Sequence, residues 1–333
     1  YWLQTAMMEA MAQDITVEEA DAIFGRPMGI PKTGVFGLLD LVGLDLMPLI
    51  GKSMKAALPA TDPYVTSYQE PEFLIKMIAD GYTGRKGKGG FYRINRDNGG
   101  KVKEALDLKT GTYRTAEKSD RLACLGVSKQ GLRTFVTFGD RGSKYAWSVL
   151  SKTLHYAASL VPEVADNLYA VDEAMRLGYN WKSGPFEMID KLGPAWFAEQ
   201  LKSQGQTVPA LVEKVGAGTF YKVDGGKTYY FTTKGTYEDV PRRPGVLLLR
   251  DIKLASKPII KNASAALWDI GDGVVCFEFT GKQNSIDLDV INLLEESIAL
   301  VEKNYKGLVV HNEGSNFSAG ANLGLALFAA NVA

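Results

Sequence analysis

Apolar residues recur at helical spacing through most of the first 230 residues of the chain. Spacings of three and four residues predict helices over 1–13, 16–24, 33–58 and 70–79, separated by turns that contain Gly and Pro. Thr16 and Glu19 stand in capping-box register at the start of the second helix. A long helical pattern returns over 145–177 and is interrupted at Pro162. These patterns predict that helical bundles make up most of the protein.

The pattern changes in the last part of the chain. Residues 265–269 and 273–279 favour two strands, the second alternating through Val275, Phe277 and Phe279. A helix over 288–304 and a buried strand over 307–310 follow. The polar stretches 94–127, with a short helix candidate over 116–124, and 232–244 are interpreted as connecting segments. The predicted fold is mainly α, with two related helical units followed by a truncated ββαβ segment.

A stretch near the start of the chain returns in its second half. Residues 21–43 read DAIFGRPMGIPKTGVFGLLDLVG, and residues 172–193 read DEAMRLGYNWKSGPFEMIDKLG, in register from Lys32 at a constant offset of 150. A second pair of blocks follows at an offset of 129, GKGGFYR over 87–93 and GAGTFYK over 216–222. The duplication predicts three domains, 1–127, 128–250 and 251–333.

Each copy of the first block places a carboxylate among apolar residues. Thr33 and Ser183 are N-cap candidates, and Pro185 suits the first helical turn. Asp40 and Asp190 then fall on the apolar stripe of their helices, where an unpaired carboxylate would cost several kcal/mol. We therefore expect each to meet Arg, Lys or backbone N–H groups. A structural role is favoured for both, with catalysis as the alternative.

The paired blocks resemble the C-terminal helical domain of the 3-hydroxyacyl-CoA dehydrogenases, present twice over about residues 1–250. The resemblance implies NAD as the cofactor of a parent enzyme and a coenzyme A thioester as its substrate. The nucleotide-binding domain and the catalytic His, Glu, Ser and Asn of that family would precede Tyr1, and no Rossmann fingerprint occurs in the chain. The resemblance places substrate contacts at Gly29, Gly34 and Phe36.

The stretch 315–323, SNFSAGANL, resembles the oxyanion loop of the enoyl-CoA hydratase (crotonase) family. The resemblance implies that the backbone N–H of Ala321 stabilises a thioester oxygen, with Gly320 allowing the tight turn. It also places CoA contacts at Asn284 and Ser285. Asn322 stands where many relatives have Asp, and the second oxyanion donor and both acid/base glutamates of that family would follow Ala333.

The basic, Gly-rich stretch 81–93 is a candidate phosphate cradle, but it matches neither common phosphate-loop pattern. A helix end turning into an extended segment at Phe91, Tyr92 and Arg93 is favoured, with Lys86 and Lys88 at most peripheral to a CoA phosphate.

The amino-acid composition limits the kinds of partner that the protein is expected to bind. Lys plus Arg and Asp plus Glu both number 38, which gives no charge excess for nucleic acid or an anionic membrane. Two distant cysteines predict no disulfide and favour a reducing, cytoplasmic compartment. No apolar run is long enough to span a membrane, and no motif predicts a metal site.

The chain begins at Tyr1 inside a helical pattern and stops soon after the SNFSAGANL loop. We therefore expect an interior piece of a bifunctional fatty-acid β-oxidation enzyme, inactive alone, that completes an acyl-CoA cleft and holds two active sites in a fixed relation. The alternative is a non-catalytic helical module for interaction or dimerisation. The sequence does not decide between a homodimer and association with a thiolase. It also does not reveal the preferred acyl-chain length.

Overall fold

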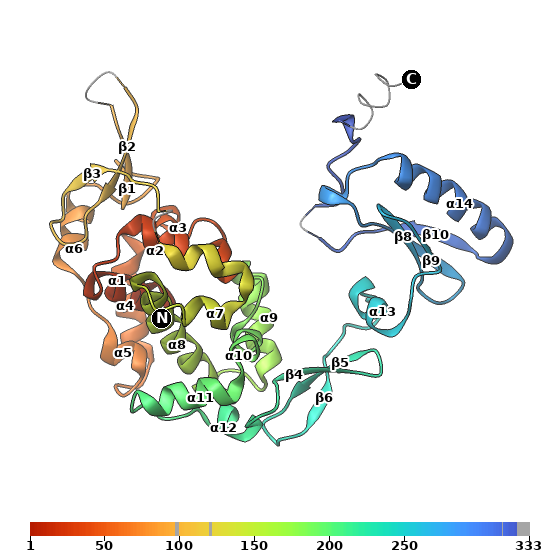
Figure 1. Cartoon of the computed structure of the whole chain (residues 1–333). Coiled ribbons are helices and arrows are strands. Elements are labelled where there is room, and N and C mark those ends of the chain that lie inside the picture. Colours follow the sequence, from red (N-terminus) through yellow and green to blue (C-terminus); the bar gives the residue numbers. More distant parts are fainter. Residues whose placement is uncertain (97–99, 120–121, 315, 325–333) are drawn as a thin grey trace. The chain divides into compact units, whose positions relative to one another are not determined.

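The computed structural model describes residues 1–96, 100–119, 122–314 and 316–324. Its contacts divide the chain into two compact units. The first comprises residues 1–221 and 231–237, and the second comprises residues 222–230 and 238–333. The described residues are mainly helical, as the sequence predicts (Figure 1).

The first copy of the duplication is a set of helices followed by a small antiparallel sheet. Its strands have the order β1-β2-β3. The elements are α1 (Trp2–Ala12), α2 (Val17–Ile23), the 3₁₀ helix η1 (Arg26–Met28), α3 (Phe36–Val42), α4 (Leu46–Ala57), α5 (Pro63–Ser67), α6 (Glu72–Ala79), β1 (Tyr92–Asn95), β2 (Val102–Leu106) and β3 (Tyr113–Thr115).

The second copy repeats this plan. Its strands have the order β4-β5-β6. The elements are the 3₁₀ helix η2 (Ala123–Gln130), α7 (Leu132–Val136), α8 (Arg141–Ser159), α9 (Leu168–Tyr179), α10 (Pro185–Leu192), α11 (Pro194–Ser203), α12 (Ala210–Val215), β4 (Tyr221–Asp224), β5 (Lys227–Phe231) and β6 (Tyr237–Asp239). The interruption of the long helical pattern near Pro162 is confirmed by the break between α8 and α9.

Three local predictions are wrong. The helix expected over 33–58 is two helices, because Gly43 has a φ of 111° and the Leu44 N–H leaves the helix to bond the carbonyl of Thr83. The segment 94–127 is no simple connector, since it carries β2 and β3. Of its helix candidate 116–124, residues 116–119 are not helical, 120–121 lie outside the described residues, and η2 begins at Ala123. The expected linker 232–244 contains β6. Short exposed strands have too few apolar residues to reveal alternation.

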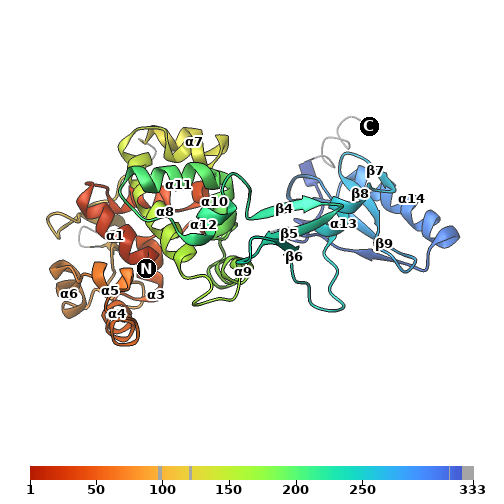
Figure 2. The same ribbon diagram turned by 90° about the horizontal axis from the view of Figure 1, so that it is seen from below.

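The two helical copies share one core within the first unit. Helix α1 packs against α8 (Figure 1, Figure 2), and the buried hydroxyl of Tyr145 donates to the carbonyl of Ala6 at 3.0 Å. The rings of Trp2 and Trp181 meet edge to face at 5.3 Å. These contacts join the copies through apolar surface, which is the main source of stability at such an interface.

The second unit contains a four-stranded sheet with the order β10-β9-β8-β7. Helix α14 (Leu288–Asn304) covers one face, and residues of α13 (Leu249–Ala255) pack on Trp268 and Cys276 from the other. The strands are β7 (Ile260–Lys261), β8 (Ala265–Asp269), β9 (Val274–Phe279) and β10 (Gly307–Val310). The predicted strands and the helix over 288–304 are confirmed. The prediction that the strand over 307–310 is buried is wrong, because β10 is an edge strand and its Val309 and Val310 are exposed. The 3₁₀ helix η3 (Lys282–Asn284) follows β9.

Among the residues that the structure describes, no helix is long and apolar enough to cross a membrane.

Candidate functional site

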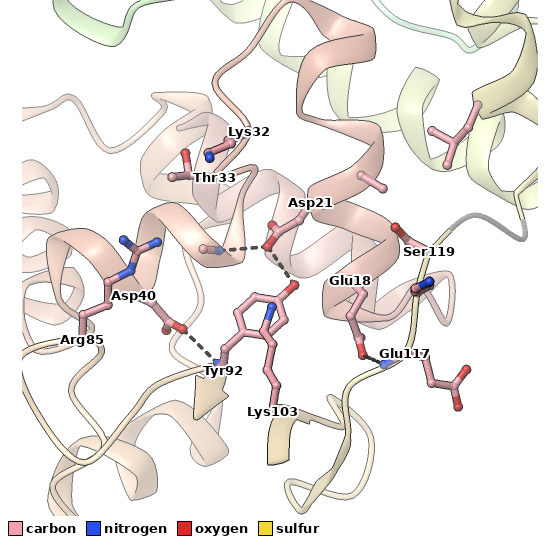
Figure 3. Close-up of a pocket in the computed structure, with 14 residues that line it drawn as sticks. Glu18, Asp21, Lys32, Thr33, Asp40, Arg85, Tyr92, Lys103, Glu117 and Ser119 are labelled. Atoms are coloured by element: carbon pink, nitrogen blue, oxygen red, sulfur yellow. Dashed lines mark hydrogen bonds between the residues drawn. The ribbon is translucent and has the colours of Figure 1, made fainter. Parts of the chain in front are cut away.

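The carboxylate of Asp21, on α2, caps the first turn of α3. It accepts hydrogen bonds from the N–H groups of Phe36 at 2.7 Å and Gly37 at 3.0 Å, and from the hydroxyl of Tyr92 at 2.9 Å (Figure 3). These N–H groups have no partner inside the helix, so a carboxylate is a favourable cap. The prediction that Thr33 caps this helix is therefore wrong, because the cap comes from a neighbouring helix.

The carboxylate of Asp40 lies at the other side of Tyr92. It accepts the N–H groups of Phe91 at 2.7 Å and Tyr92 at 2.9 Å (Figure 3). Tyr92 thus bonds Asp40 through its backbone and Asp21 through its side chain. These bonds tie α2 and α3 to the start of β1.

The second copy repeats this network atom for atom. Asp172 accepts from the N–H groups of Phe186 at 2.8 Å and Glu187 at 3.0 Å, and from the Tyr221 hydroxyl at 3.0 Å. Asp190 accepts from the N–H groups of Phe220 at 2.7 Å and Tyr221 at 2.9 Å. The prediction that Asp40 and Asp190 meet backbone N–H groups is confirmed.

Ser183 does not cap α10, contrary to the sequence prediction. Its hydroxyl instead accepts a hydrogen bond from Lys191, and Asp172 provides the cap. Sequence reasoning missed Asp21, Asp172, Tyr92 and Tyr221 as members of the network. Their recurrence in the two paired blocks was the available signal.

Burial raises the pKa of each of these carboxyls, and the hydrogen bonds act in the opposite direction. The pKa rises to about 7 for Asp21 and Asp172, and to about 6 for Asp40 and Asp190. The matched pairs of values reflect matched surroundings.

These raised pKa values predict that the first unit loses stability as the pH rises from 5 to 8. A carboxyl that binds its proton more tightly in the folded state stabilises that state fully below its unfolded pKa, near 4. This contribution to the free energy of unfolding declines as the pH rises and is gone above the folded pKa of about 6 to 7. Carboxyls with lowered pKa values, such as Glu9 and Glu18, have the opposite effect, but that effect is complete by about pH 5.

Urea denaturation at each pH, followed by tryptophan fluorescence, measures this dependence, because Trp2, Trp147, Trp181 and Trp196 lie in the first unit. The variant Asp21→Asn should show a shallower slope, by up to about 1.4 kcal/mol per pH unit near pH 6. The exposed Asp80→Asn is the matched control and should leave the slope unchanged. A wild-type stability that stays flat or rises from pH 5 to 8 would contradict the prediction.

An open cleft with a volume of about 710 Å³ lies beside this network in the first copy (Figure 3). Both buried acids and the Tyr92 ring form part of its wall. Four exposed cationic residues also line it. The lining residues are Glu18, Asp21, Ala22, Lys32, Thr33, Gly37, Asp40, Arg85, Tyr92, Lys103, Glu117, Lys118, Ser119 and Leu125.

The three residues proposed for substrate contact in this region lie outside the lining of the cleft. Phe36 is fully buried, and its ring meets that of Phe91 at 4.6 Å. Gly34 is pressed against Asp21, and Gly29 lies against the side chain of Lys182. Contact of these three residues with a substrate therefore stays a prediction.

The Gly-rich stretch 81–93 forms the predicted turn after α6 and enters β1 at Tyr92. Lys86 pairs with Asp45 at 2.7 Å, and Lys88 donates to the carbonyl of Asp80 at 2.9 Å. These two lysines are therefore engaged by the protein itself.

In the second unit, the segment 316–322 lies against 282–286. The Ile286 N–H donates to the Gly320 carbonyl at 2.9 Å, and the Asn322 N–H donates to the Ile286 carbonyl at 2.8 Å. This parallel bridge is centred on Ala321 but leaves the Ala321 N–H without an acceptor among the described residues. Gly320 has a φ of 84°, which allows the chain to turn there.

Asn284 joins this pair of segments, and Ser285 forms a bond within the first of them. The Asn284 side-chain amide donates to the carbonyl of Asn316 at 3.0 Å. The backbone carbonyl of Asn284 accepts a hydrogen bond from the Ser318 hydroxyl at 2.6 Å. The Ser285 hydroxyl donates to the Lys282 carbonyl at 3.1 Å. Ser315, the first residue of the quoted loop, lies outside the described residues.

In the part of the chain that the structure describes, no group of three or more His, Cys, Asp or Glu side chains is placed to hold a metal ion.

Comparison with known proteins gives consistent matches. Residues 1–94 match the family model of the 3-hydroxyacyl-CoA dehydrogenase C-terminal domain. The chain is 34% identical over 335 residues to a Bacillus subtilis protein named "Probable 3-hydroxyacyl-CoA dehydrogenase". It is 34% and 33% identical to proteins of Rickettsia felis and Rickettsia prowazekii that carry the provisional name fatty acid oxidation complex trifunctional enzyme. Each of these matches covers 98% of this chain and 42% of the relative.

Proposed function

We propose that this chain is part of a bifunctional enzyme of fatty-acid oxidation, an NAD-dependent 3-hydroxyacyl-CoA dehydrogenase combined with an enoyl-CoA hydratase. The observation that carries the proposal is the similarity to proteins with dehydrogenase and fatty-acid-oxidation names along 98% of the chain. The match of residues 1–94 to the dehydrogenase C-terminal domain supports the dehydrogenase part.

The first unit would serve the dehydrogenase as a scaffold. Its duplicated acid and tyrosine network fixes the helices that lie behind the cleft, and Gly29, Gly34 and Phe36 would shape the acyl-CoA site from behind. NAD would bind to a nucleotide-binding domain outside these 333 residues. The chain alone should therefore show no NAD-linked activity.

The second unit would serve the hydratase. A thioester oxygen that gains negative charge during the reaction needs aimed N–H donors, and the Ala321 N–H has no acceptor among the described residues. Asn284 holds the segment that supports this donor, and Asn284 and Ser285 would lie beside the CoA. A second copy of the chain or a thiolase would be the protein partner.

Titration calorimetry with acetoacetyl-CoA, on this chain and on a version extended at both ends, tests the proposal. The extended protein should bind acetoacetyl-CoA and produce NADH from 3-hydroxybutyryl-CoA. If it does neither, the enzyme function is wrong and an interaction module becomes the better explanation.

The role of Ala321 has a separate test in the extended protein. The substitution Ala321→Pro removes the N–H donor and should lower the hydratase kcat by about 10²-fold or more. The dehydrogenase activity of the same sample is the internal control and should not change. Equal loss of both activities, or of neither, would contradict the oxyanion role.

A further inference from the structure

The cleft in the first copy holds positive charge that the protein does not neutralise. Lys32, Arg85, Lys103 and Lys118 line it and are exposed, and none forms an ion pair in the described part of the chain. Neighbouring basic residues differ, as Lys86 pairs with Asp45. Unpaired cations that converge on one concavity favour an anionic ligand.

Four carboxyl groups also line the cleft, but the structure shows no ion pair between them and these four cations among the described residues. Asp21 and Asp40 each accept two backbone N–H groups. Glu18 is held by both terminal nitrogens of Arg114, at 2.7 and 2.9 Å, and also accepts the backbone N–H of Glu117. The Glu117 side chain is exposed at the edge of the cleft.

The second copy shows that the fold does not require Lys103. The Ala116 N–H bonds the Lys103 carbonyl as the Val240 N–H bonds the Thr228 carbonyl, so Thr228 is the counterpart of Lys103. Lys182, the counterpart of Lys32 at the offset of 150, is present and exposed in the second copy. The acid and tyrosine network is intact in both copies, so it does not require the cation at position 103.

The side chains of Arg85 and Lys103 reach the cleft from different segments of the chain. Both lie on the side of the cleft that Asp40 and Tyr92 form (Figure 3). Burial raises the pKa of Asp40, and the positive charges of these two residues oppose that rise. The Lys103 ammonium lies 4.2 Å from the centre of the Tyr92 ring. Thr33 and Ser119 add hydroxyl groups to the lining.

We propose that this cleft is a binding site for the phosphate group of a small phosphate ester, contacted by Arg85, Lys103 and Lys32. The planar guanidinium of Arg85 suits two phosphate oxygens, and each lysine supplies a mobile charge. A volume of about 710 Å³ holds the phosphate with part of its carrier. The site does not depend on the proposed enzymatic function, although a coenzyme A ester would bring phosphates of the required kind.

Titration calorimetry on the 333-residue chain tests the site with inorganic phosphate, ADP, coenzyme A and 3′-dephospho-coenzyme A as probes. At least one probe should bind, with an affinity that falls as salt is added. Arg85→Gln and Lys103→Met should each weaken binding by about tenfold, as expected for one charge-assisted contact. Both residues are exposed, so circular dichroism should show an unchanged fold.

Lys214→Gln, which removes a cation from α12 outside the cleft, is the control and should bind like the wild type. Binding that Arg85→Gln and Lys103→Met leave unchanged, or no binding of any probe, would overturn the site. If phosphate and ADP bind here while acyl-CoA does not bind the extended protein, this site stands and the proposed enzyme function fails. Loss of a coenzyme A interaction only when the 3′-phosphate is absent would identify the phosphate that occupies the cleft.

Discussion

Replacing Gly34 by alanine should lower the free energy of unfolding of the first unit by about 3 kcal/mol or more. A Cβ at this position would lie 2.4 Å from the Cα of Asp21, a backbone atom that cannot rotate away. Gly34 also has a φ of +66°, which disfavours any residue with a Cβ. The expected result is therefore a clash that displaces Asp21 from its cap on α3.

The duplication supplies a twin for this experiment. A Cβ at Gly184 would likewise lie 2.4 Å from the Cα of Asp172, but Gly184 has a φ of −75°. Gly184→Ala should therefore cost less than Gly34→Ala, by about 1 kcal/mol. Gly178→Ala is the control, because Gly178 lies in α9 with open space around it and alanine should stabilise that helix by up to about 1 kcal/mol. Urea denaturation followed by tryptophan fluorescence compares the three, and a Gly34→Ala variant as stable as the wild type would contradict the packing described here.

Replacing Phe36 by alanine should cost about 3 to 5 kcal/mol. The ring is fully buried and packs edge to face against Phe91 at 4.6 Å, so its removal leaves a cavity between α3 and the entry to β1. Phe186→Ala should have a similar cost, because its ring meets Phe220 at 4.9 Å in the same way. Urea denaturation measures both changes.

A milder substitution at Phe36 distinguishes a scaffold role of this residue from contact with the substrate. Phe36→Leu should lower stability by a smaller amount and leave the affinity of the extended protein for acetoacetyl-CoA unchanged. Phe138→Ala, at a ring that is 43% exposed, is the control and should change the free energy of unfolding by about 0.5 kcal/mol or less. A Phe36→Leu variant with wild-type stability but weakened acyl-CoA binding would show that Phe36 contacts the substrate.

Local patterns predicted elements where one face carries a continuous apolar stripe. The helix over 288–304 and the strand over 307–310 have the predicted bounds, because helical spacing is strong in the first and a short apolar run marks the second. Prediction failed where a single backbone angle or a distant partner decided the outcome. Gly43 ends α3 through its positive φ. The apolar residues of β2 stand at 102, 105 and 106, and β3 has only 3 residues, so neither strand shows alternation.

The residues of the candidate sites also fall into those that the sequence predicted and those that it could not predict. Asp40 and Asp190 could be found from the sequence, because a carboxylate on an apolar stripe needs buried partners. Asp21 gave no such signal, since its partners are the N–H groups of a helix that begins fifteen residues later. The cationic cleft could not be found either, because Lys32, Arg85 and Lys103 are far apart in the chain and ordinary on any exposed surface.

Residue patterns alone were enough to establish the duplication, the helical character of both copies and the order of strands and helix near the end. Their physical basis is local, because hydrophobic spacing and turn residues act over a few neighbours. Three-dimensional packing alone decided which N–H groups each acid accepts, which glycines must lack a side chain and which cations share one cleft. Those outcomes depend on distances between segments up to seventy residues apart, and such distances follow only from how the whole core packs.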